Sequence, residues 1–218
     1  MNLSYFIAWS GFNLIYRTLF RARFYHAERV PSHGPVILAA NHESFIDPPL
    51  VGCGLRRPLN YLARESLFNH PVAGAILRSW NAVPVDREGG GGRGLKAILD
   101  RLERGGGILL FPEGTRTSDG RLQPAKAGVG LAIIKSSCPV VPVRVFGTFA
   151  AFGRHHRLPR PHPISVAYGH ALDFTALREE ARTAAKPRVK AIYQAAADAI
   201  MAAIGGLQPC REVRRFPG

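Results

Sequence analysis

The sequence predicts an α/β fold: a single domain with a mostly buried mixed sheet flanked by helices, preceded by an N-terminal helix in the membrane interface. Short runs that are apolar throughout, such as residues 36–40, alternate with runs of helical periodicity, which is typical of strands covered on both faces. The chain has 218 residues, of which 46% are hydrophobic, so it can bury the core of one domain. It contains no internal repeat and no long linker.

The elements follow from these runs in chain order. The predicted strands are residues 36–40, 59–63, 82–85, 108–111, 140–146 and 164–168. The predicted helices are residues 48–55, 72–80, 95–102, 128–136 and 187–204, and the last should bury a stripe of Ile192, Ala196, Ala199 and Ala203. The glycine-rich residues 89–92 are predicted to be a flexible connector that lacks the Lys-Ser/Thr of a nucleotide-binding P-loop.

The first 30 residues are predicted to be an apolar and basic membrane-contact segment, followed by a folded domain over residues 31–218. Residues 3–20 are rich in aromatic and aliphatic side chains and carry no charge before Arg17. Polar residues interrupt this run, so it falls short of the roughly 20 apolar residues that cross a bilayer. Its arginines follow the run, whereas those of a signal peptide precede it. A helix lying in the interface fits best, and a helix docked on the domain is the alternative.

The charge of the chain favours anionic partners. Lysines and arginines number 29 against 15 aspartates and glutamates, a formal net charge of +14. Such a balance suits an anionic membrane surface, phosphorylated substrates or nucleic acid, but no nucleic-acid-binding motif occurs. The three cysteines, Cys53, Cys138 and Cys210, form no C-x-x-C pair, which argues against a disulfide framework or a cysteine-based zinc site. We therefore expect a protein on the cytoplasmic face of a membrane.

His42 and Asp47 directly follow the first predicted strand and are candidates for a catalytic pair. On one helix, residues five apart would point about 140° away from each other. The two side chains can therefore meet only if His42 lies in the loop and Asp47 begins the helix, a placement that Pro48 favours. A carboxylate on one imidazole nitrogen leaves the other to accept a hydroxyl proton. Ser44 lacks a G-x-S-x-G elbow and is expected to cap the helix or bond within the loop.

Several cations beside strand ends form a candidate phosphate site. Residues 111–116 leave a predicted strand and turn at once, and Gly114 permits a close backbone approach to a ligand. Arg116 offers a planar fork suited to phosphate, and Arg87 and Lys126 lie near other element ends. Each cation alone could be an ordinary surface charge. The basic, proline-rich residues 154–160 lack the carboxylates or cysteines of a metal site, so we expect a solvated surface or an anion contact there.

With these motifs in place, the chain resembles the 1-acylglycerol-3-phosphate acyltransferase family, also called lysophosphatidic acid acyltransferases. Four ordered blocks carry the resemblance, namely residues 41–47 with the HX4D motif, 83–87, 111–116 and 141–143. They cover roughly residues 30–146. Asn81 departs from the family pattern, which often has glycine ahead of the second block.

The resemblance implies an acyltransferase domain of phospholipid biosynthesis. A fatty acyl thioester on coenzyme A or acyl carrier protein would be attacked by the hydroxyl of a lysophospholipid, first of all 1-acylglycerol-3-phosphate, giving phosphatidic acid. His42 would be the base and Asp47 its orienting partner, with no metal or redox cofactor. The acceptor would be held by Arg87, Glu113, Gly114 and Arg116, to which charge and position add Lys126. Another lysolipid acceptor, such as a lyso-aminolipid, and a non-catalytic protein bound to an anionic membrane remain alternatives.

Overall fold

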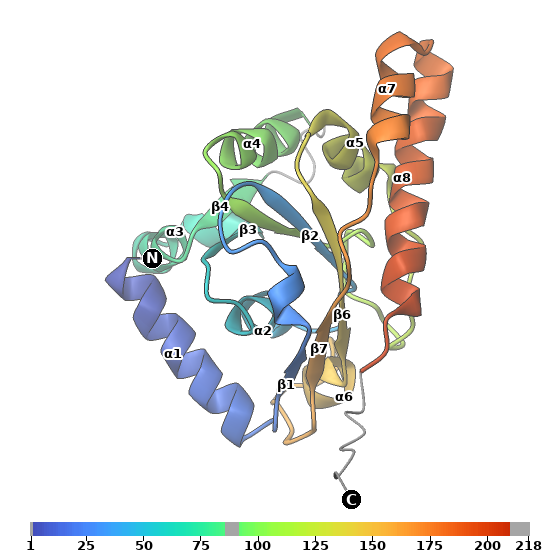
Figure 1. The fold of residues 1–218 in the computed structure, drawn as a ribbon. Coiled ribbons are helices and arrows are strands. Elements are labelled where there is room, and N and C mark those ends of the chain that lie inside the picture. Colours follow the sequence, from blue (N-terminus) through green and yellow to red (C-terminus); the bar gives the residue numbers. More distant parts are fainter. Residues whose placement is uncertain (1, 86–91, 210–218) are drawn as a thin grey trace, which may run out of the picture.

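The computed structural model describes residues 2–85 and 92–209, which fold around one seven-stranded sheet (Figure 1). The strands are β1 (Arg23–Tyr25), β2 (Val36–Ala40), β3 (Leu59–Arg64), β4 (Ala82–Val85), β5 (Gly107–Leu110), β6 (Val140–Phe146) and β7 (Ser165–Tyr168). Their order across the sheet is β1-β7-β6-β2-β5-β3-β4. All neighbours are parallel except β6 and β7, which are antiparallel, so the predicted mixed sheet is confirmed.

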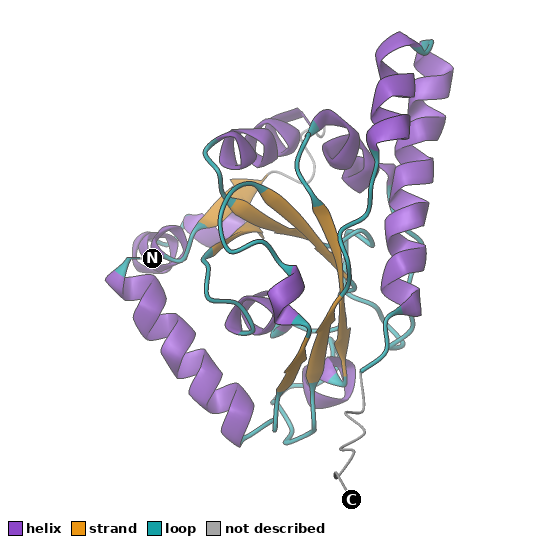
Figure 2. Ribbon diagram, in the orientation of Figure 1, coloured by secondary structure: helices purple, strands orange, loops and turns teal. Residues whose placement is uncertain are grey.

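Helices cover both faces of the sheet (Figure 2). They are α1 (Leu3–Thr18), α2 (Asp47–Cys53), α3 (Pro71–Ser79), α4 (Gly92–Glu103), α5 (Ala127–Lys135), α6 (Thr148–Phe152), α7 (Thr175–Thr183) and α8 (Lys186–Gly206), with 3-10 turns η1 (Ala27–Arg29) and η2 (Glu65–Phe68). Alternate residues of β2 enter two separate cores: Leu38 packs with α1 and α2, whereas Ile37 packs with α4, α5 and α8. This alternation follows from the two-residue repeat of a strand.

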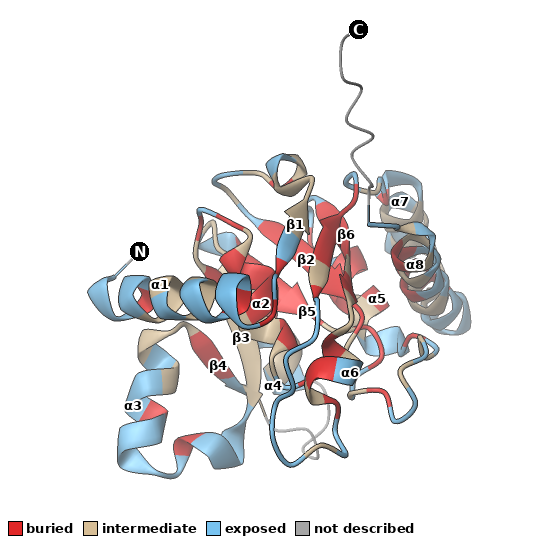
Figure 3. Cartoon of the chain, turned by 90° about the horizontal axis from the view of Figure 1, so that it is seen from below, coloured by how far each residue is buried: buried red, intermediate tan, exposed pale blue. Residues whose placement is uncertain are grey.

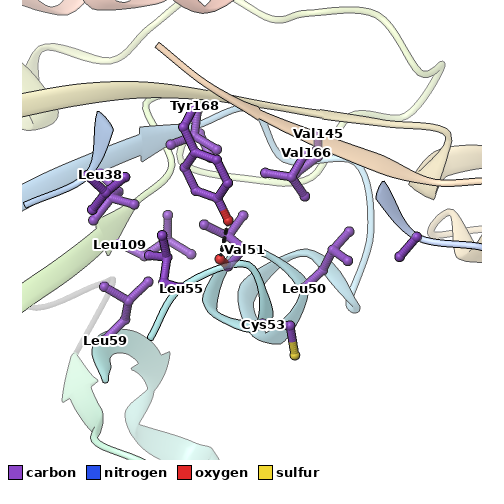
Figure 4. Close-up of a cluster of buried hydrophobic side chains, with 14 of the residues drawn as sticks. Leu38, Leu50, Val51, Cys53, Leu55, Leu59, Leu109, Val145, Val166 and Tyr168 are labelled. Atoms are coloured by element: carbon purple, nitrogen blue, oxygen red, sulfur yellow. Dashed lines mark hydrogen bonds between the residues drawn. The ribbon is translucent and has the colours of Figure 1, made fainter. Parts of the chain in front are cut away.

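The core on the α2 side contains a polar anchor. Tyr168 is completely buried, and its hydroxyl donates to the Val51 carbonyl of α2 at 2.6 Å (Figure 4). Leu38, Leu50 and Val166 surround it within the same cluster. Because a buried hydroxyl without a partner would be costly, this bond fixes where α2 lies on the sheet.

Some elements differ from the prediction. The short strand β1 was not predicted because its three residues show no apolar alternation, yet it pairs with β7. Helices α6 and α7 were also missed. In α8, Ala199 is exposed and Ala203 is only half-buried, while Ile200 and Ile204 are fully buried. The helix turns this way because burying isoleucine removes more apolar surface from water than burying alanine.

Helix α1 packs one face on the domain and presents an apolar face to solvent. Its Tyr5 and Tyr16 side chains face the domain and are buried. Its Trp9 side chain donates to the carbonyl of Gly52 in α2 and to that of Leu55 just after α2. On the outer side, six large apolar side chains are at least 46% exposed, namely Leu3, Phe6, Ile7, Leu14, Ile15 and Leu19. Within the described residues, no helix has the length and apolar character needed to cross a membrane.

The predicted boundary at residue 30 stays a prediction. Two of the side chains before it, Phe20 and Val30, belong to the core on the α2 side of the sheet. Together with β1, they tie the end of the N-terminal segment to the domain.

Asn81 takes the backbone conformation for which glycine is usually selected. Its φ is +61°, in the left-handed region, and it directly precedes β4. Asparagine enters this region more readily than most residues because its short polar side chain can bond locally. The departure from the family pattern therefore preserves the turn.

We expect Asn81→Ala to lower the free energy of unfolding by about 1 kcal/mol, because alanine is strained at positive φ. Asn81→Gly should cost less than Asn81→Ala, since glycine adopts this φ freely. Urea denaturation of both variants measures the difference. Equal losses for alanine and glycine would contradict this explanation.

Candidate active site

Two loops meet at the carboxyl edge of the sheet because the strands before them are parallel neighbours. The loop after β2 carries His42, and the loop after β5 carries residues 111–117. The Thr117 amide donates to the His42 carbonyl at 2.8 Å, and the His42 amide donates to Glu113 Oε1 at 3.3 Å. The carboxyl ends of strands are where α/β folds place ligand sites.

His42 and Asp47 are paired as the sequence predicted. Asp47 begins α2 and is fully buried, and its Oδ2 lies 2.9 Å from His42 Nδ1. The same oxygen accepts hydrogen bonds from the amides of Glu43 and Ser44, each at 2.7 Å. A carboxylate at Nδ1 selects the tautomer that carries its proton there, so Nε2 is the nitrogen able to accept a proton.

An aromatic ring also packs against one face of the imidazole. The Phe111 ring stacks on it with a centroid distance of 3.9 Å and an interplanar angle of 17°. The His42 side chain is only 14% exposed. The sequence pattern marked Phe111 as the start of a turn and gave no sign of this contact.

The histidine loop is clamped to the end of β6 and to α6. Asn41 exchanges two hydrogen bonds with the Val145 backbone, at 2.8 and 3.1 Å. Glu43 Oε2 accepts from the Thr148 hydroxyl at 3.2 Å and from the Phe149 amide at 3.1 Å. Glu43 is a positioning residue that the sequence reasoning missed, because its partners lie more than 100 residues away along the chain.

Ser44 completes this clamp. It is fully buried, its hydroxyl donates to the Phe152 carbonyl, and its backbone pairs with Gly153 in an isolated bridge. The Ser44 oxygen also accepts from the Ile46 amide at 3.3 Å, which is the hydrogen bond within the loop that the sequence predicted.

The predicted anion-binding residues surround the turn after β5. Gly114 has a φ of +70°, and its amide donates to the Phe111 carbonyl at 2.9 Å. A Cβ at Gly114 would lie 2.9 Å from Lys126 Cδ, so the exposed lysine passes close over the glycine. The Arg116 guanidinium lies over the Phe45 ring at 3.3 Å from its centroid. This stacking fixes the plane of the guanidinium.

A cavity of about 400 Å³ opens beside His42. Gly114 and Lys126 line it together with apolar side chains of the sheet and of helices α4 and α5, including Leu62, Ile98 and Leu131. Such a lining combines a polar end with an apolar wall. Arg87 lies outside the described residues, so its predicted part in the site stays a prediction.

Comparison with known proteins assigns the family. The model of the family described as Acyltransferase matches residues 21–146. The chain belongs to this acyltransferase family. The match ends with β6, so α6 and its clamp on the histidine loop lie beyond it.

Several relatives of this acyltransferase-family chain carry specific names. It is 32% identical over 124 residues to the chloroplastic 1-acyl-sn-glycerol-3-phosphate acyltransferase BAT2 of Brassica napus and to a 1-acyl-sn-glycerol-3-phosphate acyltransferase of Bacillus subtilis. In both matches the region is 56% of this chain, and it is 36% and 61% of those proteins, respectively. It is also 32% identical over 107 residues to a lyso-ornithine lipid O-acyltransferase of Pseudomonas aeruginosa, over 45% of this chain and 41% of that protein. The chain thus spans about one third to three fifths of the length of these relatives.

A solved structure has the same fold. The 1-acyl-sn-glycerophosphate acyltransferase PlsC from Thermotoga maritima superposes with a TM-score of 0.67 at 20% sequence identity. The match covers 93% of this chain and 81% of that chain. The fold therefore extends over nearly the whole of this acyltransferase-family chain, including the part after β6.

Two carboxyls beside the His42–Asp47 pair, those of half-buried Glu43 and buried Glu113, have raised pKa values. Burial raises the pKa of Glu43 from 4.5 to about 7, with a further rise from the Asp47 charge, while the bond from the Phe149 amide opposes it. Burial likewise raises the pKa of Glu113 to about 7, and the charges of Glu43 and Asp47 add to the effect. Glu113 is 2% exposed and supports the His42 backbone. Its predicted contact with the acceptor stays a prediction.

The raised pKa of Glu43 predicts a pH dependence of stability. Between pH 4.5 and about 7 the folded protein holds a proton that the unfolded chain releases, so the free energy of unfolding falls as pH rises through this window. Glu43→Gln should remove this part of the slope, at most roughly 3 kcal/mol across the window. Denaturation at several pH values measures it, with Glu103→Gln on the exposed end of α4 as the control. An unchanged slope in Glu43→Gln would disprove the assignment.

Proposed function

We propose that this chain transfers a fatty acyl group from a thioester on coenzyme A or acyl carrier protein to the free hydroxyl of a lysophospholipid. The first candidate acceptor is 1-acylglycerol-3-phosphate, which would give phosphatidic acid. The observation that carries the proposal is the His42–Asp47 pair, whose histidine lines a cavity that Lys126 also lines. The names of the Brassica and Bacillus relatives support the same acceptor.

In this reaction His42 acts as the general base. Nε2 takes the proton of the acceptor hydroxyl while the oxygen forms a bond to the thioester carbonyl carbon. The carbon–sulfur bond then breaks, and the imidazolium returns the proton to the departing thiolate. Asp47 stabilises the imidazolium, and its two bonds from backbone amides keep the carboxylate oriented for this task.

In this proposal the cations of the predicted phosphate site bind the anionic end of the acceptor. Arg116 contributes a bidentate fork whose plane is fixed by Phe45. Lys126 contributes a charge above Gly114, and Arg87 adds a second arginine. Glu113 belongs to the same binding region and acts through its bond to the His42 amide.

A second candidate acceptor is a lyso-aminolipid. The similarity to the lyso-ornithine lipid O-acyltransferase of Pseudomonas aeruginosa favours it. The chemistry at the hydroxyl would be the same, and only the group that contacts Arg116 and Lys126 would change.

We also propose that α1 lies on the cytoplasmic surface of a membrane. Its outer face carries six exposed large apolar side chains, and Arg17, Arg21 and Arg23 are exposed at and just beyond its end. An apolar face with flanking arginines suits a helix at the level of the lipid phosphates. In that position α1 would bring the site to a substrate embedded in the bilayer.

The proposed reaction is tested by His42→Ala. We expect the rate to fall by roughly 10²- to 10⁴-fold, the usual contribution of a positioned general base. Thiol release from acyl coenzyme A measures it, with 1-acylglycerol-3-phosphate and lyso-aminolipids offered in parallel. His33→Ala, a change in an exposed loop, is the control. Turnover at the wild-type rate by folded His42→Ala protein would exclude His42 as the base.

Arg116→Lys tests the binding of the acceptor. Lysine keeps the charge but loses the bidentate fork, so the apparent KM for the lysophospholipid should rise while that for the thioester stays the same. Arg121→Lys, in an exposed stretch of the same loop, serves as the matched control. A rise confined to the thioester KM would place the donor, instead of the acceptor, at Arg116.

A further inference from the structure

The loop between α6 and β7 combines positive charge with an exposed apolar tip. Arg154, Arg157 and Arg160 are all exposed, and Leu158 is 75% exposed. The loop also carries three histidines, and no aspartate or glutamate occurs anywhere between Asp119 and Asp173. The proposed reaction uses none of these side chains.

This loop lies beside the end of α1. The Ile164 amide, directly after the loop, donates to the Phe20 carbonyl at 3.1 Å, and the Arg23 amide donates to the Ile164 carbonyl at 3.2 Å. The loop and the last turn of α1 lie side by side both in Figure 1 and in the view from below in Figure 3. The loop therefore continues the surface formed by α1.

We propose that residues 154–163 are a second membrane-contact element, which lies on an anionic lipid surface together with α1. This inference rests on the proposed membrane contact of α1. Within the loop, Leu158 enters the boundary between headgroups and acyl chains, and Arg157 and Arg160 bind lipid phosphates.

An anionic membrane fits this surface better than a soluble anion does. A site for a free phosphate needs cations directed into one enclosed pocket, whereas these arginines are exposed around a protruding leucine. Exposed leucine costs free energy in water and gains it in the acyl region of a bilayer. Arg21 and Arg23, at the neighbouring end of α1, extend the same positive charge.

The contact would set the orientation of the catalytic loop. The loop between α6 and β7 begins at Gly153, which pairs with Ser44, two residues after His42. The Arg160 amide donates to the Ala151 carbonyl at 2.7 Å. A single helix on a membrane leaves the protein able to roll about the helix axis. A second contact beside it removes this freedom and fixes the direction in which the histidine loop faces.

The test measures, by sedimentation, binding to phosphatidylcholine vesicles that contain about 30% of the anionic lipid phosphatidylglycerol. Arg154→Gln/Arg157→Gln/Arg160→Gln should bind on the order of 100-fold more weakly, about fivefold for each arginine, and added salt should shrink the difference. The control Lys96→Gln/Arg104→Gln/Lys190→Gln makes the same charge change at exposed positions in α4, directly after α4 and in α8, and it should bind like wild type.

Leu158→Ser separates the apolar contact from the charge. It should weaken binding to pure phosphatidylcholine vesicles by about tenfold, because the variant no longer buries a leucine side chain in the bilayer. Wild-type binding by this variant and by the triple arginine variant would overturn the proposal. So would normal vesicle binding combined with a raised KM for acyl coenzyme A, since the arginines would then hold the phosphates of the donor.

The binding measurement does not depend on catalysis, because it is made without substrates. Leu14→Ser/Ile15→Ser tests α1 by the same measurement. If only this variant loses binding, α1 contacts the membrane and the loop proposal is wrong. Circular dichroism of every variant checks that it is folded.

Discussion

One carboxylate oxygen organises the catalytic loop, and much of the site depends on it. Asp47 Oδ2 accepts hydrogen bonds from the imidazole of His42 and from two consecutive backbone amides. The amide bonds curl residues 42–47 into a tight loop that ends in α2, and the same curl returns His42 to the carboxylate. Because the aspartate is fully buried, removing it would leave both amides and the imidazole without their acceptor. The loop conformation and the base are thus one structure.

The sheet supplies the second constraint. Strand β2 lies between β5 and β6 and runs parallel to both, so three loops emerge side by side at one edge. The loop after β5 places Phe111 against the imidazole, and the segment after β6 holds Glu43 through Thr148. The histidine loop is therefore supported from both of its neighbours.

Residues near one another in sequence could be predicted, and contacts between distant segments could not. The apolar runs gave β2, β4 and β6 with the observed bounds, and the five-residue spacing of His42 and Asp47 led to their pairing at the start of α2. Strand β1 is defined only by its partner β7, so nothing in its own three residues indicates it. The roles of Glu43 and Phe111 likewise depend on side chains brought in by other strands.

The direction of one strand has a consequence for the whole molecule. Strand β7 is antiparallel to β6, so Ser165 at its beginning lies opposite Phe146 at the end of β6. Strand β1 follows β7 in parallel, which sets Arg23 beside Ser165. The chain entering β1 from α1 and the loop entering β7 thereby arrive at the edge where the catalytic loops leave. Had β7 run parallel to β6, the catalytic loops and the end of the apolar helix α1 would lie at opposite edges of the sheet. Because β7 is reversed, both lie on one side of the protein.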